Sequence, residues 1–339
     1  MKKILCLALI ALMLFAAVGC QQTTPPATEV IDTSPINTQE PADTQTSVQT
    51  ATPDASATGD PSGSTATPVP TADIQVQIRE DFNEYLEKNS DFIGWIEIPD
   101  TKIDNPVVQG TDDYYYVYHD FDKQESSAGT LFLGIDANIF YKSQNMVLHG
   151  HNMKDGTMFA GLHQYNSNAN RNGNNALTYY QEHPLIYFDT LAGNGTYKIF
   201  ATLYLDVAEP GYRDDDLFYY LYNDFADQEE FEAFLTEIER RSLIDTTVDV
   251  SSDDQILMLS VCDTNGAYGS YSLQGSSITR GHFIVVARKV RDGESTDVDT
   301  AGAKLAENPL MDQYWYTLNG GSAPTYEDRD LNAPWFIGE

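Results

Sequence analysis

The distribution of aromatic residues constrains this chain more than any other feature of its sequence. No Phe, Tyr or Trp occurs between Ala16 and Asp81, although aromatic residues make up 12% of the 339 residues. A folded core needs large apolar side chains, because their burial supplies most of the favourable free energy of folding. We therefore expect a folded domain at residues 76–291, followed by an acidic C-terminal extension at residues 292–339.

The segment 21–75 has the composition of a disordered spacer. Its 55 residues include 13 Thr, eight Pro and seven acidic residues, with no Lys or Arg. So few apolar side chains cannot offset the entropy that ordering the chain would cost. We predict a flexible linker, which as a random coil would span roughly 40 Å.

Residues 1–20 have the features of an export signal. The basic pair Lys2-Lys3 precedes an apolar run from Ile4 to Val18, which is shorter than the roughly 20 residues of a membrane-spanning helix. The small residues that lead to Cys20 resemble the lipobox of bacterial lipoproteins, which implies a lipid anchor on this cysteine. An uncleaved signal anchor is the alternative. In either case we expect the domain on the extracytoplasmic face of the membrane, in a Gram-positive-type cell envelope.

The charge of the chain excludes two classes of partner. There are 19 Lys and Arg against 51 Asp and Glu, a formal net charge of −32. Nucleic-acid binding needs a concentrated basic face, so no nucleic-acid partner is expected. Docking of the folded body on an anionic lipid surface is excluded for the same reason.

Hydrophobic spacing predicts mostly strands with two helices. The first helix carries Ile78, Phe82 and Leu86 on one face and ends near Asn89. The second begins at a capping box, Asp227 with Glu230, followed by an apolar stripe of Phe231, Phe234, Leu235 and Ile238. Short runs bounded by turn residues predict strands at 94–98, 130–135, 146–149, 185–188, 197–207, 256–262 and 282–290. This pattern is typical of a β-barrel or sandwich with inserted helices.

The C-terminal extension differs in character from the domain before it. It is polar and acidic from Arg291 onward, so we expect it to be peripheral. It also contains aromatic residues, Trp315, Tyr316, Trp335 and Phe336, which suggest that part of it packs on another surface.

Candidate chemistry centres on one cysteine. Cys6 and Cys20 lie in the N-terminal apolar run, so Cys262 alone falls in the predicted domain, which excludes a disulfide framework there. Nucleophilic acyl transfer needs a thiolate, an imidazole and a donor for the oxyanion. Cys262 ends one predicted strand, His149-Gly-His151 ends another, and Arg280 begins a third. On Cys262 alone, a small buried core thiol is an equally good reading.

These segments, in this order, resemble the class B sortases. Arg280 stands where the family has an Arg before the strand that closes its barrel. The other matching blocks are residues 91–99, 103–109, 129–132, 149–159 and Leu259-Ser-Val-Cys262, which is similar to the family's Leu-Ser-Thr-Cys motif. The match covers roughly residues 78–290. It implies a closed eight-stranded β-barrel with an N-terminal and an inserted helix, and cysteine transpeptidation without a cofactor.

The resemblance also implies a role for each site residue. Cys262 would attack the carbonyl of Thr in a C-terminal sorting signal and form a thioacyl enzyme. His151 would protonate the leaving amine and then accept a proton from the acceptor amine, such as a peptidoglycan stem peptide or a pilin Lys. Arg280 would stabilise the oxyanion or orient the peptide. This chain departs from the family pattern at Val261, where Thr is usual, and at His149, where Tyr is common.

Other interpretations of single residues remain open. His149 with His151 could bind zinc, although no third ligand follows at a recognisable spacing. Residues 214–216, three Asp, could bind calcium or form a solvated loop. His282 is expected to be a half-buried strand residue. Residues 114–116, three Tyr, could line a groove or cover an edge of the core.

Two competing functions follow from the departures and from the chain order. A tethered, catalytically weak sortase-like binding module would fit Val261 and the strong acidity, which disfavours a thiolate. A papain-like peptidase fits poorly, because in that family the cysteine comes early in the mature chain and the histidine far downstream.

Overall fold

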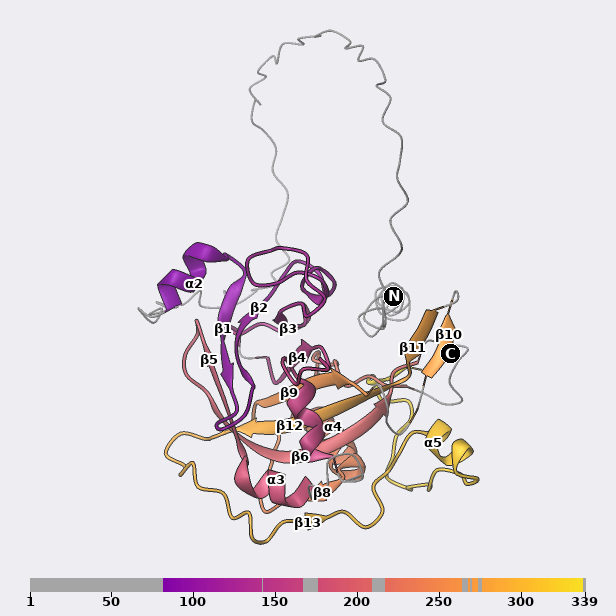
Figure 1. The fold of residues 1–339 in the computed structure, drawn as a ribbon. Helices are drawn as coiled ribbons and strands as arrows, with labels where there is room; N and C mark the ends of the chain where they lie inside the picture. The colour runs from indigo at the N-terminus through magenta and orange to yellow at the C-terminus, as the bar shows by residue number, and fades with distance from the viewer. Residues whose placement is uncertain are drawn as a thin grey trace, which may run out of the picture. The chain divides into compact units, whose positions relative to one another are not determined.

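A closed eight-stranded barrel forms the centre of the protein (Figure 1). The computed structural model describes residues 82–141, 143–166, 176–208, 217–263, 268, 270–273 and 276–337, and all of them belong to one compact unit. Around the barrel the strand order is β1-β2-β3-β4-β9-β12-β6-β5. The strands are β1 (Phe92–Glu97), β2 (Asp104–Val108), β3 (Leu131–Leu133), β4 (Asn145–Gly150), β5 (Leu185–Thr190), β6 (Thr196–Asp206), β9 (Ile256–Cys262) and β12 (Gly281–Lys289). The predicted barrel is confirmed.

The pairing of three adjacent strands brings together segments that are far apart in sequence. β4 runs parallel to β9, with Gly150 opposite Val261. β12 runs antiparallel to β9, with His282 opposite Cys262. Both histidines of the His149-Gly-His151 segment therefore come to the end of β9, where the cysteine lies.

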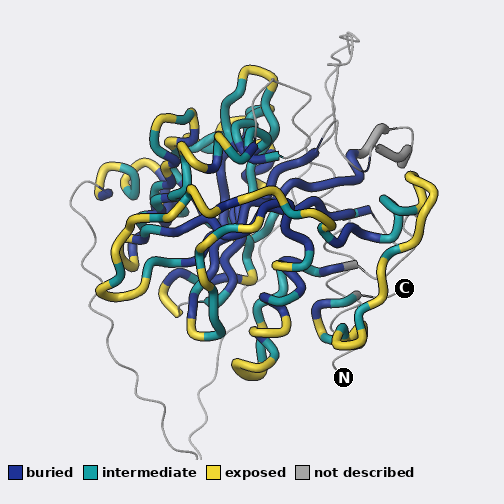
Figure 2. Tube along the Cα trace, turned by 90° about the horizontal axis from the view of Figure 1, so that it is seen from below, coloured by how far each residue is buried: buried dark blue, intermediate teal, exposed yellow. Residues whose placement is uncertain are grey.

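Side chains on these strands alternate between two apolar clusters. Leu257, Leu259 and Val261 of β9 belong to a large cluster that includes residues from all eight barrel strands. The alternate residues Ile256 and Met258 belong to a second cluster on the outer face. Figure 2 shows the strands as a dark blue buried centre with exposed loops around it. Cys262 follows the alternation of Met258, so its side chain lies on the outer face of the barrel wall.

The two predicted helices are present. α2 (Asn83–Lys88) ends at Asn89 as expected. α4 (Gln228–Arg241) is capped by Asp227, whose carboxylate accepts the N–H of Glu230 at 2.9 Å. The apolar stripe of α4 is fully buried in the outer cluster. The Glu230 side chain accepts from the N–H of Ala226 and not from the cap residue itself, so the capping box is displaced by one residue.

Several shorter elements were not predicted, because two to seven residues carry too little periodicity. They are η3 (Tyr115–Val117), η4 (Ala160–Tyr165), α3 (Ala176–Glu182), α5 (Gln313–Leu318), β7 (Leu217–Phe218), β8 (Ile244–Asp245), β10 (Ser270–Leu273), β11 (Ser276–Thr279), β13 (Lys304–Leu305) and β14 (Phe336–Ile337). None of the helices in the described ranges is long and apolar enough to cross a membrane. The predicted signal and linker lie outside the described residues.

The C-terminal extension packs on the barrel domain over much of its length. β13 pairs with β8 and β14 pairs with β7. Trp335 is 4% exposed and joins the outer cluster beside Phe234 of α4, with ring centroids 5.6 Å apart. The aromatic residues of the extension therefore contribute to the fold, and Trp335 is part of its core.

Candidate functional site

Cys262 ends β9 and lines a cavity of about 60 Å³. The cavity is bordered by the ends of β4, β9 and β12 together with η3 and its flanking loops. Its other described lining residues are Asp113, Tyr116, Val117, Thr130, Phe132, His149, Gly150, His151, Leu221, Ser260 and His282. Cys262 is disulfide-bonded in this structure, so the thiol chemistry below belongs to the reduced protein. The structure thus brings Cys262, His149 and His151 together, as the sequence predicted.

The two histidines of β4 and its end are held differently. His151 Nε2 lies 2.8 Å from the carbonyl oxygen of Val117. A carbonyl only accepts, so Nε2 carries a hydrogen, and in the neutral ring Nδ1 keeps its lone pair. The His149 ring stacks on Phe132 with centroids 5.1 Å apart. His151 therefore has a fixed tautomer with a basic nitrogen available for proton transfer.

Burial keeps the imidazoles of the cavity neutral at pH 7. Desolvation, together with the nearby His282, lowers the pKa of His149 to about 3. Desolvation alone lowers the pKa of His282 to about 4. The pKa of His151 is also lowered by burial, partly offset by the bond to Val117. Burial raises the pKa of Asp113 to about 6, although the N–H of Ile135 binds its carboxylate. The cavity therefore has no imidazolium near Cys262 at pH 7.

The backbone of Cys262 is hydrogen-bonded to the segment that follows β4. Asn152 Nδ2 donates to the carbonyl oxygen of Cys262 at 3.1 Å. His163 of η4 places Nε2 at 3.2 Å from the same oxygen. These two contacts fix the end of β9 relative to the loop that carries His151.

Arg280 is placed beside this cavity but is not among its lining residues. Its Nε and Nη2 both donate to Asp206 Oδ2, at 2.9 and 2.7 Å. Its guanidinium carbon lies 3.2 Å from the ring centroid of Tyr314, from the C-terminal extension. Arg280 is 4% exposed and Asp206 is 2% exposed. The expected catalytic role of Arg280 remains a prediction, and in this structure its charge is paired with a buried carboxylate.

His282 is the residue that sequence reasoning underestimated. It lies in a strand as expected, but it is 7% exposed and not half-buried, and its Nε2 is 3.7 Å from Cys262 Sγ. Strand alternation could have identified His282 as a site candidate. His282 follows Arg280 by two residues, so the two side chains are expected on the same face of the sheet. Ser260, two residues before Cys262, was missed for the same reason.

The other candidate residues fall in different places. Tyr116 is buried, donates to Asp91 at 2.6 Å and also lines the Cys262 cavity, while Tyr115 stacks on His119 at 3.9 Å. The Tyr cluster therefore covers an edge of the core and contributes one residue to the site. The described residues contain no group of three His, Cys, Asp or Glu side chains arranged for a metal ion. Residues 214–216 lie outside the described part.

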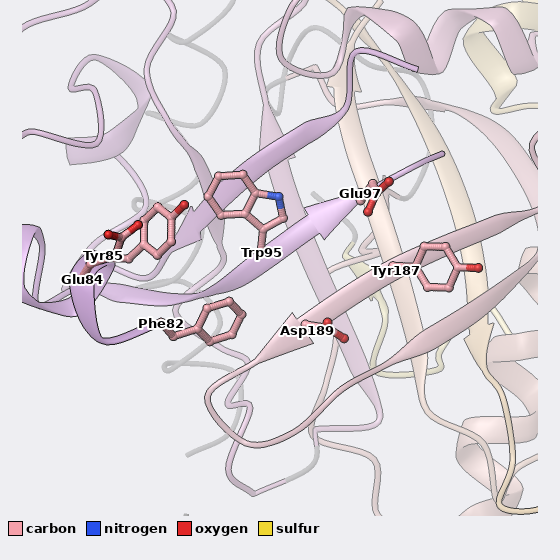
Figure 3. A pocket seen from close by; sticks show the side chains of 7 residues that line it. All are labelled: Phe82, Glu84, Tyr85, Trp95, Glu97, Tyr187 and Asp189. Carbon is pink, nitrogen blue, oxygen red and sulfur yellow. The ribbon is translucent and has the colours of Figure 1, made fainter. Parts of the chain in front are cut away.

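Figure 3 shows a second, larger cavity of about 320 Å³, bordered by α2, β1 and β5. It is lined by four aromatic rings and three carboxylates, from Phe82, Tyr85, Trp95, Tyr187, Glu84, Glu97 and Asp189. None of these residues is a Cys, Ser, Thr or Lys, and no histidine among the described residues lines this cavity to activate a nucleophile. The smaller cavity at Cys262 is therefore the candidate active site, in spite of its size.

Comparisons with known proteins agree with this fold. No family model matches the chain. Sortase B from Listeria monocytogenes serovar 1/2a is 30% identical over 212 residues, which cover 62% of this chain and 79% of that protein. The structure of a Staphylococcus aureus sortase B–substrate complex is 26% identical with a TM-score of 0.50, covering 63% of this chain and 86% of that one. A sortase B complexed with triglycine has a TM-score of 0.51 at 26% identity, covering 64% and 88%.

Proposed function

This chain belongs to the sortase B family and is a cysteine transpeptidase, and from that premise we propose that Cys262 is its nucleophile. The observation that carries the proposal is the cavity at the end of β9, where the Cys262 sulfur lies among His149, His151 and His282. In the reduced protein the Cys262 thiolate attacks the carbonyl of Thr in a C-terminal sorting signal. A thioester forms, and the amide bond after Thr breaks.

His151 moves the proton in both halves of the reaction. Its Nδ1 accepts the thiol proton, since Nε2–H is engaged with Val117. The resulting imidazolium gives that proton to the leaving nitrogen. In the second half Nδ1 takes a proton from the attacking amine and returns it to the sulfur as the thioester is cleaved. Protons and charges balance without a cofactor.

The substrates follow from the family relationship. Relatives have been crystallised with a substrate and with triglycine, a peptide that ends in a primary amine. We infer that this protein takes a sorting-signal peptide as acyl donor and an amine as acceptor, such as a peptidoglycan stem peptide or a pilin Lys. The outcome is either anchoring of surface proteins to the cell wall or pilus-type assembly.

Export and tethering are part of the same proposal. The N-terminal signal, Cys20 and the Thr- and Pro-rich linker would hold the catalytic domain on the extracytoplasmic face of the membrane. A Cys20→Ser variant should be released from the membrane or remain unprocessed. If it stays membrane-bound with unchanged mass, an uncleaved signal anchor holds the protein instead of a lipid.

The alternative of a catalytically weak binding module is not favoured. One observation that suggested this alternative was Val261, which lacks the hydroxyl of the Thr that is usual at this position. Val261 is 1% exposed, packs in the large inner cluster and is not among the residues that line the Cys262 cavity. Its side chain therefore bears on barrel packing more than on the reacting groups.

The proposal is tested by incubating the reduced protein with a small panel of labelled sorting-signal peptides and triglycine. Mass spectrometry then measures the cleaved peptide and the amide product. We expect the wild type to join at least one peptide of the panel to triglycine. We expect Cys262→Ala to join none of them. Product formation by Cys262→Ala at the wild-type rate would refute Cys262 as nucleophile.

A further inference from the structure

The sulfur of Cys262 has an imidazole as its neighbour on the adjacent strand. Cys262 and His282 are direct partners in the antiparallel pairing of β9 with β12. His282 Nε2 lies 3.7 Å from Cys262 Sγ, within hydrogen-bonding reach of sulfur. Both residues line the same cavity. His282 therefore touches a reacting atom.

The opposite edge of the His282 ring is held by two hydroxyl groups. Its Nδ1 lies 3.0 Å from Ser260 Oγ and 3.2 Å from the hydroxyl of Tyr220. These two hydroxyls are 3.1 Å apart, and all three side chains are buried. Such a closed triangle fixes the orientation of the ring, so the Nε2 edge is directed at Cys262.

The hydrogen positions follow from the charge of the sulfur. A hydroxyl can donate to Nδ1, which leaves the hydrogen of the neutral ring on Nε2. The opposite tautomer would present the Nε2 lone pair to an electron-rich thiolate, and that contact is repulsive. The tautomer with hydrogen on Nε2 is therefore the one compatible with a Cys262 thiolate. Burial keeps this ring neutral, because it lowers the pKa of His282 to about 4.

Arg280, the cation near β12 in the sequence, is paired with a carboxylate and not with the Cys262 sulfur. Arg280 lies two residues before His282 in the sequence. Its Nε and Nη2 both donate to Asp206 Oδ2. Turning the guanidinium toward Cys262 would leave a carboxylate that is 2% exposed without this partner, which is strongly unfavourable. The neighbouring sulfur therefore depends on neutral donors.

We propose that His282 is a catalytic residue of this transpeptidase, which donates a hydrogen bond from Nε2 to the Cys262 thiolate, with Ser260 and Tyr220 as its positioning residues. The inference rests on the proposed role of Cys262 as nucleophile. No proton is transferred to or from His282, so the proton exchange by His151 is unchanged. His282 thus acts on the thiolate, a different role from the one that the resemblance implies for Arg280, which is to stabilise the oxyanion or orient the peptide.

Several titratable groups besides His282 face the cavity and bear on the thiolate. They come from β4 and its end and from η3 and its preceding loop, and they are His149, His151, Asp113 and Tyr116. Tyr220, from the segment after β7, contacts His282 Nδ1 and not the cavity. At pH 7 the imidazoles are neutral and Asp113 is largely ionised. A negative Asp113 disfavours the thiolate, so a hydrogen-bond donor at the sulfur has a larger effect.

The test measures how the alkylation rate of Cys262 depends on pH. The full chain is reduced, freed of reductant and treated with iodoacetamide between pH 5 and 9, and peptide mass spectrometry follows Cys262 separately from Cys6 and Cys20. Because the thiolate is the reactive form, loss of the donor in His282→Phe should move the midpoint upward by about one pH unit and slow alkylation at pH 7 about tenfold. The amide of His282→Gln should restore part of the rate.

Matched variants separate this role from general effects. His183→Gln also removes an imidazole, but His183 binds the carbonyl of Pro99 and does not line the cavity, so its profile should match the wild type. Ser260→Ala and Tyr220→Phe should give intermediate shifts. Urea unfolding verifies that each variant is folded under the assay conditions.

A folded His282→Phe protein with the wild-type midpoint would overturn the inference. A folded His282→Gln protein no faster than His282→Phe would also overturn it, because a donor at that position should help. Neither result would touch the proposed function, which fails separately if Cys262→Ala still joins a sorting peptide to triglycine.

Discussion

Two groups of polar side chains near the N-terminal end of β12 differ in charge: one surrounds Cys262 and the other surrounds Arg280. Around Cys262 the polar groups are imidazoles, hydroxyls and one carboxylate, that of Asp113, and burial keeps the imidazoles neutral. Around Arg280 the buried groups are ions. Asp206 and Asp312 face Arg280 and Arg241, and Asp312 also accepts the backbone N–H of Asp206 at 2.6 Å.

The second group is closed by the C-terminal extension. Asp312 and Tyr314 come from the extension, and Arg329, also in it, donates to Glu237 of α4 at 2.8 Å. Buried ion pairs of this kind hold segments in register, because removing one partner leaves an uncompensated charge. We call these groups the cysteine cavity, defined by the lining residues of Cys262, and the Arg280 cluster, defined by Asp206, Arg241, Arg280, Asp312 and Tyr314. Arg280, two residues before His282, therefore serves to stabilise the fold through its ion pair with Asp206.

The largest effect should come from the proton carrier of the cysteine cavity. His151→Ala should lower turnover about a thousandfold, since general acid–base catalysis by one side chain contributes on the order of 10² to 10⁴. His149→Ala should lower it by less than about tenfold, because the His149 ring packs on Phe132. Steady-state transfer of a sorting peptide to triglycine measures both. Equal losses in the two variants would mean that the proton carrier has been assigned to the wrong histidine.

In the Arg280 cluster the main effect should fall on stability. Asp206→Asn removes the charge opposite Arg280 and should lower the free energy of unfolding by about 3 kcal/mol in urea titrations. The Cys262 alkylation profile of the folded variant should stay within about twofold of the wild type. Unchanged stability with complete loss of transpeptidation would show that Arg280 acts on the substrate and that the two groups are one site.

Arg280→Lys changes the other partner of the Asp206–Arg280 ion pair. Lysine keeps the charge but loses the planar fork, which donates to Asp206 through two nitrogens. We expect this variant to be less stable in urea titrations, while the folded protein transfers a sorting peptide to triglycine at close to the wild-type rate. Badly impaired transfer by a stable, folded variant would show that the guanidinium acts on the substrate.

The sequence was most informative where a local pattern matches a local structure. The apolar run at residues 256–262 predicted β9 to the residue, and Asp227 with the apolar stripe after it predicted α4. The resemblance placed Cys262, His151 and Arg280 in one site, and the structure brings Cys262 and His151 into one cavity whose described lining does not include Arg280. These predictions rest on short apolar runs, on a period of 3.6 residues and on motifs within a few positions.

The sequence was least informative where a contact depends on pairing register or on a distant segment. The pairing register of β12 with β9 decides whether Arg280 or His282 lies opposite Cys262. The two residues are two positions apart, so strand alternation in the sequence cannot distinguish them. The partners of Arg280 come from β6 and from the extension, which are 74 and 34 positions away. Composition made the extension look peripheral, yet its charged residues pair with buried partners in the domain.

The smallest effect concerns stability in acid. The pKa of His282 is lowered to about 4 in the folded protein, so between about pH 6.5 and 4 the unfolded state binds more protons, and stability is lost as pH falls through this window. His149 acts in the same direction. Urea titrations at pH 7 and 5 should therefore show a loss that is about 2 kcal/mol smaller in His282→Gln than in the wild type. An identical loss would mean that His282 is not held as a neutral buried ring.

The most direct test of the account is to capture the thioester at the cysteine cavity. The reduced full-length protein is mixed with a cleavable sorting-signal peptide without an acceptor amine, quenched in acid and analysed by intact and fragment mass spectrometry. The account predicts an added mass equal to the peptide up to and including its Thr, located on Cys262 and released by triglycine. An adduct on another residue, or peptide transfer to triglycine with Cys262 replaced by Ala, would contradict it.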